Sequence, residues 1–262
     1  MERRFFFKTL GIASLPLFFG SVGYANSKKK SKSTNNDDNL QKFLEIIQKA
    51  KDNSWETLPM GLLMGRIGMQ FLETPYVGGT LDRNEEEKCV VNLLELDCVT
   101  FFENVLGISR ILKNGLYTYD DLINQVTETR YRNRILKDYT SRLHYTAEWI
   151  IDNEKKGIVR DITNSIGGYK LDINVWFMSE NADKYPALKN NPRFVPVIKS
   201  VEQVINSRRY WYLPKDKVRI YEQLIQTGDI IAIATNMPGL DYSHTGIAYR
   251  DDDDNLRLLH AS

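Results

Sequence analysis

The stretch Leu96-Asp97-Cys98-Val99-Thr100-Phe101-Phe102-Glu103-Asn104-Val105-Leu106 decides how this sequence is interpreted. Asp97 is a good helix N-cap, and the apolar residues after it recur on one face of a helix, which Gly107 is expected to end. Cys98 therefore lies in the first turn of the expected helix. Unpaired backbone N–H groups and the positive end of the helix dipole stabilise a thiolate there, and the thiolate is the reactive form of cysteine.

The sequence contains only two cysteines, and the other one, Cys89, follows Lys88 without a comparable cap. Cys98 has three interpretations. It is a catalytic nucleophile, a buried small hydrophobic residue, or one half of a Cys89–Cys98 disulfide. Two cysteines in a domain of this size do not make a disulfide framework. The cysteines alone leave all three interpretations open.

Two of the three histidines lie in the C-terminal part of the chain. His244 begins a β-rich segment over residues 245–249, and His260 ends another over residues 256–260. Two strands joined by a turn can place these imidazoles side by side. A cysteine nucleophile needs a base that a second polar group holds in the correct tautomer, so the pair favours a catalytic site. A lone histidine in a strand is more often structural.

The order of the remaining elements predicts an α+β fold, with helices first and a small antiparallel sheet after them. Helices are expected over residues 40–50, 58–72, 119–136 and 143–151, and strands over 230–235, 245–249 and 256–260. Residues 157–191 show no clear pattern and are interpreted as an elaboration of the core. The Asp251–Asn255 segment lacks the glycine and the distal glutamate of a calcium loop, so it is expected to form a solvated hairpin turn.

The N-terminus predicts export. Arg3-Arg4 precedes an apolar run from Phe5 to about Phe19, and Gly23-Tyr24-Ala25 has the small-x-small pattern of a cleavage site. Residues 1–25 are therefore interpreted as a signal peptide, of a form that resembles twin-arginine signals. The run is short for a membrane span of roughly 20 residues, and an uncleaved anchor is the alternative.

The domain organisation and the localisation follow from that signal. Residues 26–39 are expected to be a disordered linker, and residues 40–262 one folded domain. The mature chain is expected in the periplasm or outside the cell, without stable membrane insertion. Lysine and arginine total 35 against 34 acidic residues, and this balance argues against nucleic acid as a partner.

Five elements in order resemble the NlpC-type papain-like cell-wall peptidases. They are Pro75-Tyr76-Val77-Gly78-Gly79-Thr80, Leu96-Asp97-Cys98, Gly228-Asp229-Ile230, His244-Thr245-Gly246-Ile247 and His260-Ala261-Ser262. Each motif alone is weak, but their common order makes a chance resemblance improbable. The long insertion between Cys98 and His244, with Arg142-Leu143-His144-Tyr145 and Glu148-Trp149 inside it, resembles the N-acetylmuramoyl-L-alanine amidase-like branch of that superfamily.

The resemblance implies a papain-like fold with N-terminal helices packed on a small antiparallel sheet. It implies Cys98 as nucleophile, His244 as base and His260 as the residue that orients His244. Tyr76 is expected to help bind the substrate or the oxyanion, or else to pack. Asp97 matches an acidic residue that endopeptidases of the group use toward a substrate amine, or it serves only as the helix cap. His144 is expected either to line the substrate cleft or to pack in its helix.

The activity that this resemblance implies is hydrolysis of the N-acetylmuramoyl-L-alanine amide of peptidoglycan fragments by a monomer. The alternatives are an endopeptidase that cleaves between D-glutamate and the diamino acid, and an inactive wall-binding module. No cofactor is expected, and no metal, because the sequence lacks the spaced histidine and carboxylate pattern of zinc amidases. Relatives continue beyond the position of Ser262, so the sequence is expected either to be truncated or to have a short sheet.

Overall fold

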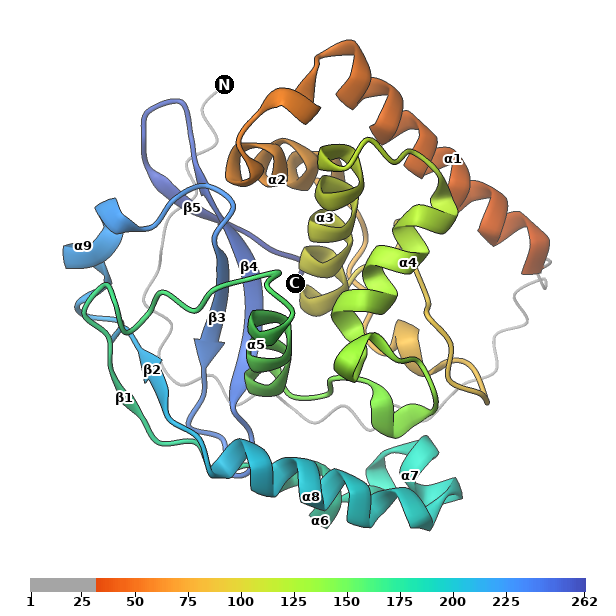
Figure 1. Ribbon diagram of the computed structural model, residues 1–262, viewed down its shortest axis with the longest axis vertical. Helices are drawn as coiled ribbons and strands as arrows, with labels where there is room; N and C mark the ends of the chain where they lie inside the picture. The colour runs from red at the N-terminus through yellow and green to blue at the C-terminus, as the bar shows by residue number, and fades with distance from the viewer. Residues whose placement is uncertain (1–31) are drawn as a thin grey trace.

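The computed structural model describes residues 32–262, with side chains from Asp37 onward, and has a mixed α+β architecture (Figure 1). The helices are α1 (Lys32–Asp52), α2 (Met60–Gly68), α3 (Cys98–Lys113), α4 (Tyr119–Arg130), α5 (Thr146–Lys155), α6 (Phe177–Glu180), α7 (Pro186–Asn190), α8 (Val195–Asn206) and α9 (Val218–Tyr221). The strands are β1 (Tyr169–Leu171), β2 (Tyr210–Tyr212), β3 (Ile230–Ala234), β4 (Tyr242–Arg250) and β5 (Leu256–Leu259).

The N-terminal helix starts earlier than the sequence suggests. Residues 32–39 belong to α1 where a disordered linker was expected, whereas the expected signal peptide and residues 26–31 lie outside the described residues. Asn39 explains part of this difference, because it is buried and its side-chain oxygen accepts the Leu93 N–H at 2.6 Å. No helix in the described part of the chain is both long and apolar enough to cross a membrane.

Helix α3 runs through the centre of the molecule, between the sheet and α4 (Figure 1). The prediction that Gly107 ends this helix is wrong, since α3 continues to Lys113. Gly107 instead lets α4 approach, because a Cβ atom there would lie 2.9 Å from a methyl group of Leu122. The chain leaves the helix at Gly115, which has a φ of 68° and so adopts the left-handed conformation that glycine tolerates.

The three predicted C-terminal strands are confirmed. They form an antiparallel sheet in the order β3-β4-β5, and the Asp251–Asn255 segment makes the turn between β4 and β5. Strand β4 packs against α3 through Ile247, which is completely buried in the same core cluster as Phe101 and Val105. The first helix turn of α3 therefore lies against the central strand.

The insertion between α3 and β3 forms a second core of its own. Its buried residues come mainly from α5 to α8, and β2 adds Tyr210 from the two-stranded β1-β2 ribbon. Figure 1 shows this ribbon below and to the left of α3. Tyr145 donates a hydrogen bond to Glu202 of α8 at 2.8 Å, and both side chains are buried. The segment 157–191, which showed no sequence pattern, contains only short elements whose order depends on this second core.

A buried ion pair joins the helices around α3. Glu103 of α3 accepts a hydrogen bond from Arg130 of α4 at 2.7 Å, and the two side chains are only 1% and 2% exposed. Glu103 also accepts the indole N–H of Trp149 from α5 at 3.1 Å, and Arg130 donates to the carbonyl of Val90. One carboxylate therefore connects three helices and the segment that leads to Cys98.

We predict that Glu103→Gln lowers the free energy of unfolding by about 3–5 kcal/mol, because it leaves the Arg130 charge buried without a counter-charge. The matched control is Glu95→Gln, which removes the exposed Arg83–Glu95 pair and should cost no more than about 1 kcal/mol. Urea denaturation of the three proteins measures both values. Equal losses in the two variants would contradict the importance of the buried pair.

Candidate active site

Cys98 is the first residue of α3 and is partly exposed. Both cysteines are free thiols, so the disulfide interpretation does not hold in the structure. Cys89 differs from Cys98, because its Sγ lies 3.6 Å from the carbonyl of Ile123 and burial raises the pKa of its thiol. A thiol held protonated in this way is a poor nucleophile. The two environments single out Cys98 as the candidate.

Asp97 forms the expected N-cap and completes a capping box with Thr100. Its carboxylate accepts the backbone N–H groups of Val99 at 3.1 Å and Thr100 at 2.7 Å, while the Thr100 hydroxyl accepts the Asp97 N–H at 2.9 Å. The N–H of Cys98 itself has no acceptor among the described residues. The cap thus occupies the two following N–H groups and leaves the one on the candidate nucleophile free.

Tyr76 lies beside the start of α3. Its segment pairs in parallel with Leu96, where the N–H of Val77 donates to the Leu96 carbonyl at 2.9 Å. Partial burial and the nearby Cys98 and Asp97 raise the pKa of the Tyr76 hydroxyl. The side chain is 53% exposed, so packing is not its main role. The hydroxyl is therefore near enough to Cys98 and Asp97 for their charges to affect its pKa.

His244 and His260 lie side by side, as the hairpin pattern predicts. His244 is on β4, His260 directly follows β5, and the Nε2 atom of His244 lies 3.0 Å from the Nδ1 atom of His260. One of these two nitrogens must donate and the other accept. If His244 donates through Nε2, its Nδ1 atom carries a lone pair and can take a proton. Burial lowers the pKa of His244, and His260 lowers it further, so the neutral form predominates at neutral pH.

Strand β4 is fastened to two helix N-termini on either side of His244. The Thr245 hydroxyl donates to the carbonyl oxygen of Cys98 at 2.8 Å. The Asp241 carboxylate, just before the strand, accepts the N–H of Ala147 in the first turn of α5 at 2.7 Å. Neither contact has a signal in the sequence, because the two partners of each lie far apart in the chain.

A hollow of about 270 Å³ brings Cys98, His144 and His244 together, whereas Tyr76, Asp97 and His260 are not in its lining. Cys98 and His244 line it, and so do side chains from the insertion, among them Arg142 and His144. Asp82, from the loop that follows Tyr76, lines it as well. The lining of the hollow therefore combines Cys98 and His244 with residues of the insertion.

His144 is half-buried in the wall of this hollow. Its Nε2 atom lies 2.7 Å from the carbonyl oxygen of Tyr139, which can only accept, so Nε2 carries the proton. Burial and the positive charge of Arg142 lower the pKa of His144 to about 3. His144 is therefore neutral at physiological pH, and its Nδ1 atom is an acceptor for a substrate N–H or O–H group.

Arg142 is nearly buried and its charge is already balanced. It donates to Asp82 at 2.6 Å, lies 3.3 Å from Glu87, and its guanidinium covers the ring of Tyr139 at 4.8 Å. With two carboxylates beside it, Arg142 is not a free receptor for an anion. Its contacts instead hold the Asp82 loop against the insertion.

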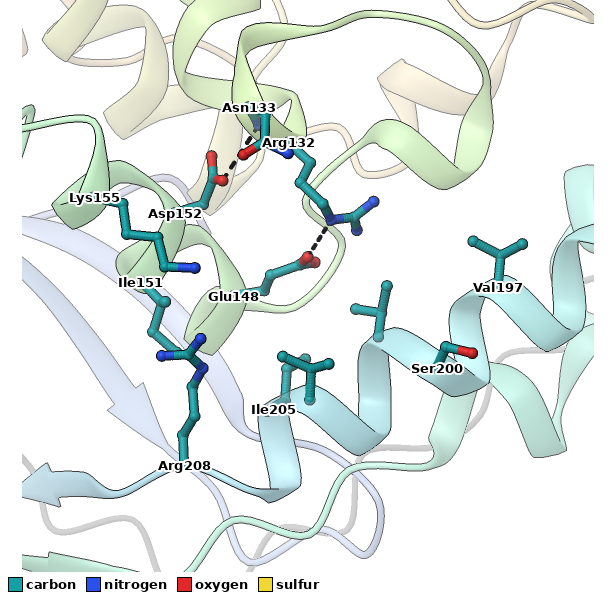
Figure 2. A pocket seen from close by; sticks show the side chains of 12 residues that line it. Arg132, Asn133, Glu148, Ile151, Asp152, Lys155, Val197, Ser200, Ile205 and Arg208 are labelled. Atoms are coloured by element: carbon teal, nitrogen blue, oxygen red, sulfur yellow. Dashed lines mark hydrogen bonds and ion pairs between the residues drawn. The ribbon is translucent and has the colours of Figure 1, made fainter.

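A second hollow, of about 300 Å³, lies between α5 and α8 (Figure 2). Figure 2 shows Glu148 facing Arg132, with Val197 and Ile205 on the opposite side. This hollow has no cysteine or histidine in its lining. Glu148 thus belongs to a different surface from Arg142 and His144, and Trp149 is buried against Phe102, with ring centroids 4.9 Å apart.

A metal centre has no candidate in residues 32–262, because no group of three or more histidine, cysteine, aspartate or glutamate residues there could hold an ion. The four aspartates at residues 251–254 shape a turn instead. Asp251 accepts the N–H of Asn255 at 2.8 Å and pairs with Arg257.

We predict that His144 makes the protein less stable in acid. Its pKa is about 3 when folded and near its ordinary value of 6.5 when unfolded, so the unfolded chain binds the extra proton between these values. The free energy of unfolding therefore falls as the pH drops through 6.5. Between pH 7 and pH 5 the wild type should lose about 2 kcal/mol more than His144→Gln, which keeps a donor for Tyr139 but does not titrate. Urea denaturation at both pH values tests this, and equal losses would contradict it.

Solved structures resemble this chain over most of its length. An N-acetylmuramoyl-L-alanine amidase from Bacteroides uniformis ATCC 8492 is 36% identical, with a TM-score of 0.72 over 78% of this chain and 85% of that one. A protein from Bacteroides fragilis, described as a proposed xylanase, is also 36% identical, with a TM-score of 0.70 over 76% and 86%. Protein LPG0564 from Legionella pneumophila, at 18% identity and a TM-score of 0.62, shares the fold over 88% and 86%.

No curated protein matches this chain. The model of the AmiA-like family, described as N-acetylmuramoyl-L-alanine amidase-like, matches residues 66–262. This range contains the whole hollow with Cys98 and His244, together with Tyr76 and His260. The chain therefore belongs to the N-acetylmuramoyl-L-alanine amidase-like family of peptidoglycan hydrolases.

Proposed function

We propose that this protein hydrolyses the amide bond between N-acetylmuramic acid and L-alanine in peptidoglycan fragments, through a thioester on Cys98. The observation that carries the proposal is the hollow that Cys98 and His244 both line. The Nε2 atom of His244 lies 3.0 Å from the Nδ1 atom of His260. Membership of the amidase-like family and the amidase from Bacteroides uniformis support the choice of bond.

In the proposed mechanism His244 takes the proton of the Cys98 thiol through Nδ1, and the thiolate attacks the amide carbonyl. The Nε2–H of His244 donates to Nδ1 of His260, which fixes the tautomer that this step needs. The imidazolium then gives the proton to the leaving amine of L-alanine. Water, deprotonated by His244, hydrolyses the thioester and releases the muramic acid carboxylate.

The negative charge on the carbonyl oxygen needs donors at the start of α3. The Cys98 N–H is free because Asp97 occupies the N–H groups of the next two residues, and the positive end of the helix adds to the field there. The Tyr76 hydroxyl is the second donor in our proposal. Burial, Cys98 and Asp97 raise its pKa, so the hydroxyl keeps its proton and can donate it in a hydrogen bond. Asp97 itself acts as the cap, because its carboxylate is occupied by backbone donors.

The insertion is proposed to bind the substrate through acceptors. His144 offers the Nδ1 lone pair, and Arg142 is balanced by Asp82 and Glu87, so the wall suits a neutral group that donates hydrogen bonds. The description of the Bacteroides fragilis protein suggests glycoside hydrolysis, which requires two catalytic carboxyl groups, an acid and a base or nucleophile. Asp82 is paired with Arg142 and Asp241 accepts backbone N–H groups, which favours the cysteine chemistry instead.

We further propose a papain-like arrangement of the NlpC type and export of the protein to the periplasm or the cell exterior, where its substrate lies. The capped helix that carries the cysteine and the histidine hairpin packed against it support the first proposal. The second rests on the N-terminal sequence 1–25.

We predict that Cys98→Ala lowers the turnover of muropeptides by at least about 1000-fold, since it removes the nucleophile. Cys89→Ala, which changes the other thiol, should leave the rate unchanged. Mass spectrometry of the digested muropeptides identifies the bond, because the amidase frees the amine of L-alanine. A freed diamino-acid amine would show the endopeptidase instead, and full activity of Cys98→Ala would exclude cysteine catalysis.

We predict that the acid limb of kcat/KM has its midpoint below pH 6.5. Burial lowers the pKa of His244 and so keeps it neutral, and able to accept a proton, in weak acid. A pH-rate profile with a single muropeptide substrate measures the midpoint. A limb centred above pH 6.5 would mean that the base is a different group or that His244 is not shielded from water.

A further inference from the structure

Strand β4 bears His244, and it meets the nucleophile helix mainly through apolar packing. Ile247 lies in the common core with α3, but such packing has no preferred direction and tolerates small shifts along the strand. The general-base step needs the thiol and the imidazole within hydrogen-bond reach. Some directional contact must therefore fix α3 against β4.

Thr245 makes that contact. It directly follows His244, its side chain is only 1% exposed, and its hydroxyl donates to the carbonyl oxygen of Cys98 at 2.8 Å. The acceptor belongs to the nucleophile's own residue, and the donor is the neighbour of the base. Because the site is buried, water cannot easily replace the hydroxyl.

The hydrogen-bonding pattern elsewhere makes this contact distinctive. The buried threonines Thr100, Thr129 and Thr140 bond within their own segments, as Thr129 does with the carbonyls of Gln125 and Val126 in its own helix. Asp241 also fastens β4, but to α5 of the insertion rather than to α3. Thr245 alone, among the side-chain hydrogen bonds of the described residues, links β4 to the residue Cys98.

We propose that Thr245 is a positioning residue, whose hydroxyl holds the Cys98 main chain and thereby sets the distance between the Cys98 thiol and the His244 imidazole. This inference rests on the proposed function, since it takes Cys98 and His244 as the reacting pair. Thr245 does not touch the reacting atoms in this scheme. It acts through the backbone of one partner and the strand of the other.

The test compares three variants of the full chain. Thr245→Val keeps the shape and the β-branching and removes only the hydroxyl, Thr245→Ser restores the hydroxyl, and Thr129→Val is the matched control in α4. A displacement of about 1 Å at a reacting pair costs on the order of 100-fold. Thr245→Val should therefore lower kcat about 10- to 100-fold with little change in KM, Thr245→Ser should recover most of it, and Thr129→Val should leave both constants unchanged.

Three kinetic outcomes would overturn the proposal. In the first, Thr245→Val has the kcat of the wild type. In the second, Thr245→Ser is as slow as Thr245→Val, which would assign the effect to the methyl group. In the third, Thr245→Val raises KM with kcat intact, which would indicate substrate binding. Thermal melts of Thr245→Val and Thr129→Val separate a loss of fold from a loss of alignment.

A second measurement does not need the substrate. Iodoacetamide alkylates Cys98 at a rate that depends on deprotonation by His244, and peptide mass spectrometry separates Cys98 from the partly buried Cys89. At pH 6 to 7, Thr245→Val should slow the alkylation of Cys98 about 10-fold relative to the wild type. If the wild type fails to hydrolyse muropeptides but this difference appears, the proposed substrate is wrong and the positioning role stands. If hydrolysis occurs and the alkylation rates are equal, the positioning role is wrong.

Discussion

The buried carboxylate of Glu103 constrains the arrangement of the helices more than any single apolar contact does. A charge in the core is tolerated only where partners surround it, and here the partners come from three places: Arg130 on α4, Trp149 on α5 and, through Arg130, the carbonyl of Val90. Apolar packing would accept several helix angles, whereas this set of hydrogen bonds accepts few. The helix that begins with Cys98 is therefore held at its centre before its N-terminus meets the sheet.

The candidate site forms where three other parts of the chain meet the start of α3. The loop at Tyr76 lies along the residue before the cap, the hairpin supplies the two histidines, and the insertion closes the far wall with His144. The side chains that these parts contribute carry little uncompensated charge. His144 is neutral, Arg142 is balanced, and burial lowers the pKa of His244. In the mechanism that we propose, the charge that develops during acyl transfer is then the main one that the helix terminus has to stabilise.

The parts that the sequence predicted well have local signals. Asp97 indicates a helix start because aspartate is a preferred N-cap residue. The β-rich segments around His244 and His260 indicate two strands joined by a turn. The errors arise where tertiary packing decides. Gly107 resembles a helix stop but makes room for α4, and residues 32–39 resemble a linker although Asn39 reaches Leu93. Thr245 and Asp241 could not be found at all, because their partners have no fixed spacing along the chain.

The hydrogen bond between Thr245 and Cys98 closes a loop of 147 residues, and this separation has a consequence for the order of events during synthesis. Contacts of such range form late, because the chain between them must be ordered first. The helix that begins with Cys98 leaves the ribosome long before the hairpin that carries His244 and His260. During that interval the thiol has no imidazole beside it. If Cys98 and His244 react as we propose, the chain therefore has no complete site until β4 and β5 have been translated and have docked against α3.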